Sequence, residues 1–149
     1  MQLTIRSYVS DAMADEVFEG FDLNLFTFLS PIFPKMHVNR FDGCKTGDVV
    51  SVSLFVPLLP EQKWISEIVS HQSIPGQSHQ FIDEGRTIPF FLSTWKHTHR
   101  IEQVEKDVLI TDAIQFTTPW YFPAFLAYLM LYPSFNSRKK KYAKYFTRI

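Results

Sequence analysis

The chain has a single cysteine and no excess of either charge, and both features narrow the classes of protein that fit it. Cys44 stands alone among 149 residues, which excludes an internal disulfide framework and a thiolate metal site. The 15 basic and 15 acidic residues cancel, so we expect no general attraction to nucleic acid. With no disulfide to maintain, a reducing cytoplasm is the simplest compartment.

The sequence also lacks the patterns that predict a secretory signal or a membrane-spanning segment. The first residues show no basic region followed by an apolar run, so we expect no secretory signal. The longest apolar stretch, Trp120–Tyr132, is shorter than the roughly 20 residues that a bilayer requires, and it contains Pro123. We therefore expect no transmembrane segment. The basic run Arg138–Lys141 that follows leaves a transient contact with a membrane surface open.

Aromatic residues, in contrast, are plentiful, with 15 Phe, 6 Tyr and 3 Trp. So much ring surface indicates a large core, and it can also line a pocket. No linker, internal repeat or low-complexity tract divides the chain. We expect one domain over residues 1–149.

Apolar periodicity predicts a central β region between helical segments. Two short helices, over Ala12–Phe21 with a cap at Ser10-Asp11 and over Asn24–Leu29, follow the first strand. A long helical pattern covers Trp120–Phe146, with a kink or restart expected at Pro133. The strands are expected over Gln2–Val9, Met36–Phe41, Val49–Val56, Lys63–His71, His79–Glu84, Ser93–Gln103 and Val108–Thr117.

The strand over Ser93–Gln103 carries the residues with the most chemistry. Alternation places four side chains on one face, namely Trp95, His97, His99 and Ile101. If Glu105-Lys106 is a two-residue hairpin loop, the apolar faces of this strand and the next one coincide. In that register Trp95 lies opposite Phe116, His97 opposite Ile114, and His99 opposite Asp112.

The expected His99–Asp112 pair has three meanings that the sequence leaves open. It can be a buried pair that satisfies both groups, a general acid or base, or an anchor for the polar head of a ligand. Two histidines at this spacing are a weak zinc signal, so no metal and no cofactor is expected. Asp83 and Arg86 are expected to form a solvated ion pair at a strand end.

Several short motifs, taken in order, resemble the START/Bet v 1-like superfamily, in particular its bacterial ligand-binding members grouped with polyketide cyclase/dehydrase-like proteins. The motifs are Leu29-Ser30-Pro31, Phe81-Ile-Asp83-Glu, Pro89-Phe90, Trp95-x-His97-x-His99, Asp112, Pro119, and Phe135-x-x-Arg138 with Tyr142 and Phe146. They cover nearly the whole chain. The chain departs from the pattern after Pro119, where Trp120-Tyr-Phe-Pro123 replaces a small glycine-containing turn.

The resemblance implies an α+β helix-grip fold, in which a curved antiparallel sheet of about six to seven strands wraps a long C-terminal helix. It also implies a cavity between sheet and helix for a hydrophobic or amphipathic small molecule such as a lipid, isoprenoid or polyketide. Carried onto this chain, Phe28 and Phe33 would close one end of the cavity. Its walls would be Trp95, His97, His99, Asp112, Ile114 and Phe116 from the sheet, and Phe122, Phe125, Leu126, Leu129 and Met130 from the helix.

Three functions are consistent with these observations. The first is a binding module that holds an apolar or amphipathic small molecule. The second is a cyclase or dehydratase that uses His99 and Asp112 as general acid and base. The third is an interaction protein, monomeric or homodimeric, whose cavity is filled by its own aromatic rings.

Overall fold

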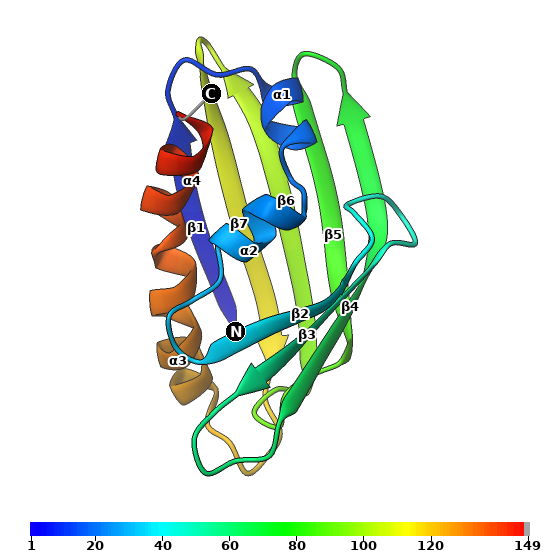
Figure 1. Ribbon diagram of the computed structural model, residues 1–149, viewed down its shortest axis with the longest axis vertical. Helices are drawn as coiled ribbons and strands as arrows, with labels where there is room; N and C mark the ends of the chain where they lie inside the picture. The colour runs from blue at the N-terminus through cyan, green and yellow to red at the C-terminus, as the bar shows by residue number, and fades with distance from the viewer. Residues whose placement is uncertain (148–149) are drawn as a thin grey trace.

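The computed structural model describes residues 1–147 and shows one antiparallel sheet curled around a C-terminal helical arm (Figure 1). The sheet has seven strands in the order β1-β7-β6-β5-β4-β3-β2. The strands are β1 (Gln2–Val9), β2 (Lys35–Phe41), β3 (Val49–Phe55), β4 (Gln62–Ile74), β5 (Ser78–Thr87), β6 (Thr94–Val104) and β7 (Asp107–Thr117). All seven expected strands are present, which confirms the predicted antiparallel sheet.

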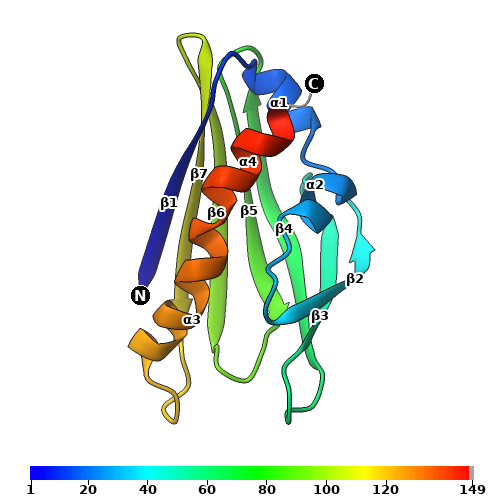
Figure 2. The same ribbon diagram turned by 60° about the vertical axis from the view of Figure 1, so that its left-hand side comes forward.

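The helices lie on the inner face of this sheet. Helices α1 (Ala14–Glu19) and α2 (Leu23–Phe28) follow β1, and α3 (Ala124–Asn136) leads directly into α4 (Arg138–Phe146). Figure 2 shows the α3–α4 arm running along the sheet, with its outer side facing away from the strands. The predicted architecture of two short helices and a long C-terminal helical arm is confirmed. None of the described helices is long and apolar enough to cross a membrane.

The core consists of two clusters of buried side chains along the arm. We call the cluster at α4 the upper cluster and the cluster at α3 the lower cluster. Val17, Leu25 and Phe81 belong to the upper cluster, together with Tyr142 and Phe146 of α4. The lower cluster joins Trp95, Ile114 and Phe116 of the sheet to Leu131 and Phe135 of α3. The residues that alternation directs inward from β6 and β7 therefore pack against the residues that helical spacing directs inward from the arm.

Several helix boundaries differ from the prediction. Helix α1 begins after Met13 rather than at Ser10-Asp11, since Asp11 has a φ of 49° and its N–H donates to Asp107. Helix α3 begins at Ala124 rather than Trp120 and continues through Pro133. The restart that was expected at Pro133 lies one turn further along, at Ser137, whose hydroxyl donates to the Ser134 carbonyl.

The predicted orientation of the long helix was also wrong. Phe125, Leu126, Leu129 and Met130 lie on the outer side of α3 and are 39–60% exposed, while Phe122, before the helix, is half-buried. The face against the sheet is instead formed by Ala127, Leu131 and Phe135, which are spaced four residues apart. Because this segment is apolar almost all round, its sequence carries no periodic signal that marks the buried side.

The two residues expected to close the cavity do not lie together at an inner end. Phe33 is 64% exposed. Phe28 is half-buried and packs against Tyr145 of α4, with ring centroids 5.4 Å apart. Neither position therefore forms the predicted gate of a cavity in this arrangement.

Candidate functional site

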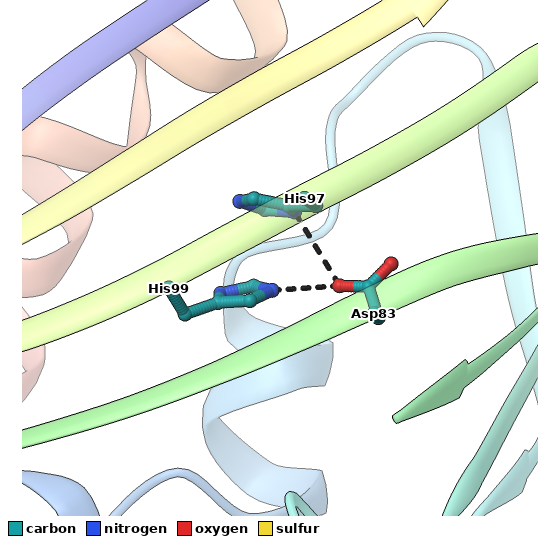
Figure 3. A group of neighbouring side chains, drawn as sticks. All are labelled: Asp83, His97 and His99. Carbon is teal, nitrogen blue, oxygen red and sulfur yellow. Dashed lines mark hydrogen bonds and ion pairs between the residues drawn. The ribbon is translucent and has the colours of Figure 1, made fainter. Parts of the chain in front are cut away.

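Strands β5, β6 and β7 bring two aspartates and two histidines together on the inner face of the sheet. The β6–β7 register is the predicted one, with His99 opposite Asp112 and His97 opposite Ile114. Asp83 of β5 lies opposite His97 on the other side of β6. Figure 3 shows both imidazole rings directed toward the Asp83 carboxylate. All four side chains are at least nine-tenths buried as residues.

The hydrogen bonds in this group run diagonally between strands, which corrects the expected His99–Asp112 pair. His97 Nε2–H donates to Asp112 Oδ1 over 2.8 Å, and His99 Nε2–H donates to Asp83 Oδ2 over 2.8 Å. The distance from His99 Nδ1 to Asp112 Oδ1 is 3.5 Å. Diagonal neighbours can meet because strands twist and long side chains lean along them.

Asp83 is the member of the group that the sequence argument missed. It does not pair with Arg86, which instead forms ion pairs with Glu67 and Glu84 at the surface. Asp83 accepts a hydrogen bond from Trp95 Nε1 as well as the one from His99. The signal was present, because Asp83 shares the inner phase of β5 with the buried residues His79 and Phe81.

Helix α4 adds a cation and a phenol to the group from the opposite side. Arg138 Nη1 lies 3.3 Å from Asp112 Oδ1, and its guanidinium stacks over the Phe135 ring at 4.4 Å from the ring centroid. Tyr142, one turn further along α4, is fully buried. The Phe135-x-x-Arg138 and Tyr142 positions of the sequence motif therefore face the Trp95-x-His97-x-His99 motif.

Burial and neighbouring charges shift the pKa values of these groups in different directions. Burial, and next the adjacent His99, lower the pKa of His97 to about 4, so its imidazole is neutral at pH 7. Burial alone would raise the pKa of Asp112, but Arg138 and the His97 hydrogen bond hold it well below its usual range. Burial and the Asp112 charge raise the pKa of Tyr142. The interior therefore holds carboxylates beside a neutral imidazole and a neutral phenol.

Three polar atoms of this buried group make no hydrogen bond of ordinary geometry with the described residues, although the Tyr142 hydroxyl interacts with Arg138 and Asp112. The three atoms are His99 Nδ1, Asp112 Oδ2 and the Tyr142 hydroxyl. The Asp112 carboxylate is common to all three, because His99 Nδ1 approaches it and Tyr142 interacts with its charge. Buried polar atoms are satisfied in the great majority of cases, so three together indicate a place for a further polar group.

The space around the group is filled by rings. Trp95 packs edge-on against Trp64 at 4.6 Å, and Phe135 contacts both Trp95 and His97. A hollow of about 520 Å³ is lined by Trp95 and Phe116 as well as by Lys96 and Gln115, and another of about 340 Å³ lies between Met1 and α3. The predicted sheet residues Trp95 and His97 thus form part of a wall of packed rings.

Three of the grouped side chains could also hold a metal ion. Asp83, His97 and His99 each offer one ligand atom, and these atoms lie within 4.8 Å of one another. Two imidazoles and a carboxylate are a donor set that zinc and iron(II) accept.

Comparison with solved structures identifies the fold. Norcoclaurine synthase from Thalictrum flavum, in complex with dopamine and hydroxybenzaldehyde, is similar over 99% of this chain and 88% of its own, with 10% identity and a TM-score of 0.67. Ara h 8.0201 is similar over the full length of both chains, with 12% identity and a TM-score of 0.64. No family model and no curated protein sequence matches the chain.

A third similar structure is larger than this chain. It is the nucleoside-diphosphate sugar epimerase from Corynebacterium glutamicum, with 18% identity and a TM-score of 0.69 over 95% of this chain and 28% of the epimerase. The chain therefore has the START/Bet v 1-like helix-grip fold, as the sequence resemblance implied.

Proposed function

We propose that the protein binds a small amphipathic molecule between the sheet and the α3–α4 arm, with the polar end of the molecule at Asp112. The observation that carries this proposal is the trio of unpartnered buried atoms, His99 Nδ1, Asp112 Oδ2 and the Tyr142 hydroxyl. A hydroxyl or amine of a ligand can donate to the carboxylate and exchange hydrogen bonds with the other two. Such a contact would satisfy groups that otherwise cost free energy when buried.

The apolar end of the molecule would lie against the lower core. Trp64, Phe122 and Tyr128 pack there while remaining partly exposed. A change of rotamer in these rings would expose less apolar surface than a change in the fully buried ones. A few polar groups at the base of an aromatic lining are typical of small-molecule sites. The norcoclaurine synthase structure supports the size of ligand, since dopamine and hydroxybenzaldehyde each combine a ring with polar groups. We place this binding activity in the cytoplasm, in a monomer or homodimer.

A second candidate function is acid–base catalysis on the bound molecule. Asp83 holds His99 through Nε2, and this leaves His99 Nδ1 as an imidazole nitrogen free to exchange a proton with a ligand. The carboxylate that orients the base would then be Asp83 rather than Asp112. On an identified substrate, Asp83→Asn should reduce turnover more than it weakens binding. Unchanged turnover in that variant would remove the catalytic candidate and leave binding intact.

The binding proposal is tested by native mass spectrometry with a matched pair of variants. Tyr142→Phe removes an unpartnered buried hydroxyl, and Tyr8→Phe removes a hydroxyl from a side chain on β1 that is 59% exposed. We expect the parent protein and Tyr8→Phe to carry the same co-purifying small molecule, and Tyr142→Phe to carry about two- to tenfold less of it, the effect of one net hydrogen bond.

The same pair separates a ligand from simple packing. If the hydroxyl normally serves a ligand, Tyr142→Phe folds but releases the molecule. If nothing binds, removal of an unpartnered buried hydroxyl should raise the melting temperature, and all three proteins should give the mass of the bare chain. That second pattern would contradict the proposed function.

A further inference from the structure

We propose that Asp83, His97 and His99 form a binding site for a divalent transition-metal ion, through Asp83 Oδ2, His97 Nδ1 and His99 Nε2. This site lies on the β5 side of the two imidazoles, whereas the proposed ligand site lies on their Asp112 side. Figure 3 shows the two rings beside each other, and both nitrogens face the same carboxylate oxygen, Asp83 Oδ2. The inference therefore goes beyond the proposed function and uses different atoms.

Two of the three distances between the donor atoms lie near those found around one ion. Asp83 Oδ2 lies 2.8 Å from His99 Nε2 and 3.7 Å from His97 Nδ1. An ion with bonds of about 2.1 Å separates neighbouring ligand atoms by about 3.0 Å in octahedral and about 3.4 Å in tetrahedral geometry. These two distances lie on either side of those values, and all three donor atoms lie within 4.8 Å of one another.

The hydrogen bond of His97 to Asp112 directs the other ring nitrogen of His97 toward Asp83. His97 Nε2–H donates to Asp112 over 2.8 Å, and His97 Nδ1 faces the Asp83 carboxylate oxygen over 3.7 Å. That distance is too long for a hydrogen bond, whereas a metal ion between the two atoms would accept electron density from both.

Asp112 lies next to the imidazole nitrogens that face away from the proposed ion. A carboxylate that accepts hydrogen bonds from metal-bound histidines is usually found in this position. Asp112 Oδ1 accepts from His97 Nε2–H and lies 3.5 Å from His99 Nδ1. If an ion takes Nε2 of His99, the ring proton moves to Nδ1 and points toward this carboxylate. The unpartnered state of His99 Nδ1 is then explained, because metal-bound histidines usually donate their second N–H to a carboxylate or carbonyl.

The surroundings hold the other ligands in place. Trp95 Nε1–H binds Asp83 Oδ1, which leaves Oδ2 for the ion. The Phe81 ring stacks on the His99 ring at 4.2 Å between centroids and sets its plane. The two buried carboxylates, Asp83 and Asp112, face one buried guanidinium, Arg138. Two nitrogen donors and one oxygen donor point to Zn²⁺ or Fe²⁺ rather than Mg²⁺ or Ca²⁺.

The test uses Zn²⁺ as the probe on the whole chain, produced in zinc-supplemented medium and dialysed against zinc-free buffer. We expect one zinc per chain by elemental analysis, and affinity measured by competition with a chromophoric chelator. Asp83→Asn and His99→Gln keep side-chain volume and should weaken binding at least about 100-fold, the upper end of the effect of an outer partner. His37→Gln, on the exposed side of β2, is the matched histidine control and should leave affinity unchanged.

Two further measurements keep the test decisive if a site variant fails to fold. Co²⁺ bound to the parent protein should give visible ligand-field bands of a nitrogen–oxygen site, and the exposed-site variant Tyr8→Phe should leave zinc affinity unchanged. Failure of the parent to retain zinc, or equal weakening in His37→Gln, would overturn the metal site. A parent protein that retains zinc but carries no co-purifying molecule would count only against the proposed ligand site, so the two failures are distinguishable.

Discussion

Two regions of the inner face combine aspartate with histidine, and they differ in how completely their hydrogen bonds are satisfied. Near the end of the β4–β5 hairpin, His79 binds Asp15 through Nε2 and Ser73 through Nδ1, over 2.7 and 2.8 Å. Asp15 also accepts two contacts from the Gly76 N–H, and Phe18 stacks on the His79 ring. We call this group of Asp15, Ser73 and His79 the upper network. Both ring nitrogens of His79 and both carboxylate oxygens of Asp15 have a partner, and Asp15 remains half exposed.

The central group, made of Asp83, His97, His99, Asp112 and Arg138, lies deeper and keeps unused hydrogen-bonding capacity. Asp112 is fully buried, and one of its oxygens has no partner within the described chain. The upper network fastens α1 to the hairpin and is complete without any further molecule. The same residue types therefore form a fully hydrogen-bonded clasp in one region and keep an unpartnered buried oxygen in the other.

The largest difference should appear when one carboxylate is removed from each region. Asp112→Ala leaves the buried Arg138 charge unpaired, so we expect a loss of about 3–5 kcal/mol in the free energy of unfolding. Asp15→Ala removes a solvent-accessible acceptor and should cost clearly less. Urea unfolding of both variants measures the two losses. Equal losses in the free energy of unfolding would show that burial of the Asp112 carboxylate does not make its removal more costly.

A smaller effect should appear as coupling within the central group. His97→Leu and Asp112→Leu each leave a buried polar partner behind, whereas the double variant removes the hydrogen-bonded pair together. We expect the double variant to lose about 1–3 kcal/mol less than the sum of the two single losses. A double-mutant cycle by chemical unfolding measures this term. Strict additivity would mean that the His97–Asp112 contact does not form.

The rate at which the Cys44 thiol is alkylated measures how readily the region around α1 opens. The Sγ–H of Cys44 donates to the Phe21 carbonyl, and burial, then the Asp48 charge, raise the pKa of the thiol from 9.0 to about 12. At pH 8 the folded protein should therefore hold about a thousandfold less thiolate than an unperturbed thiol. We expect slow alkylation by iodoacetamide in the parent and a several-fold faster reaction in Asp15→Asn, which loosens α1. An unchanged rate in that variant would argue that the clasp does not hold this end closed.

The smallest expected effect is the acid dependence of the upper clasp. The Gly76 N–H, and next the His79 hydrogen bond, lower the pKa of Asp15 below its unfolded value of about 3.9. The resulting stability is present above that value and is lost as pH falls through the lower, folded-state pKa. The melting temperature of the parent should exceed that of Asp15→Asn at pH 7. The gap should narrow below about pH 4, and a gap independent of pH would contradict this assignment.

The sheet was predictable because its constraints are local. Alternation in β6 and β7, with the loop at Glu105-Lys106, fixed a register that the structure reproduces residue by residue. It correctly placed Trp95, His97 and His99 on the inner face. The same alternation in β5 places Asp83 on the inner face with His79 and Phe81. Neighbouring side chains of one strand share a face whatever the rest of the fold does.

The partners inside the group could not be predicted in this way. Register placed His99 beside Asp112, yet His97 makes the short hydrogen bond, since sheet twist brings diagonal neighbours together. The buried face of α3 was equally hidden, because Leu129 and Met130 are as apolar as Leu131. Only the packing of the arm on the sheet selects which of them is covered.

The sequence by itself determined the succession of strands along the chain, the inner faces of β6 and β7, and the presence of imidazoles and carboxylates inside an aromatic core. The tertiary structure alone decided which histidine meets which aspartate, and that Arg138 and Tyr142 reach them from α4. Periodicity acts over a few residues and is written in the chain. Twist, helix rotation and the distances between donor atoms arise only when distant segments pack against one another.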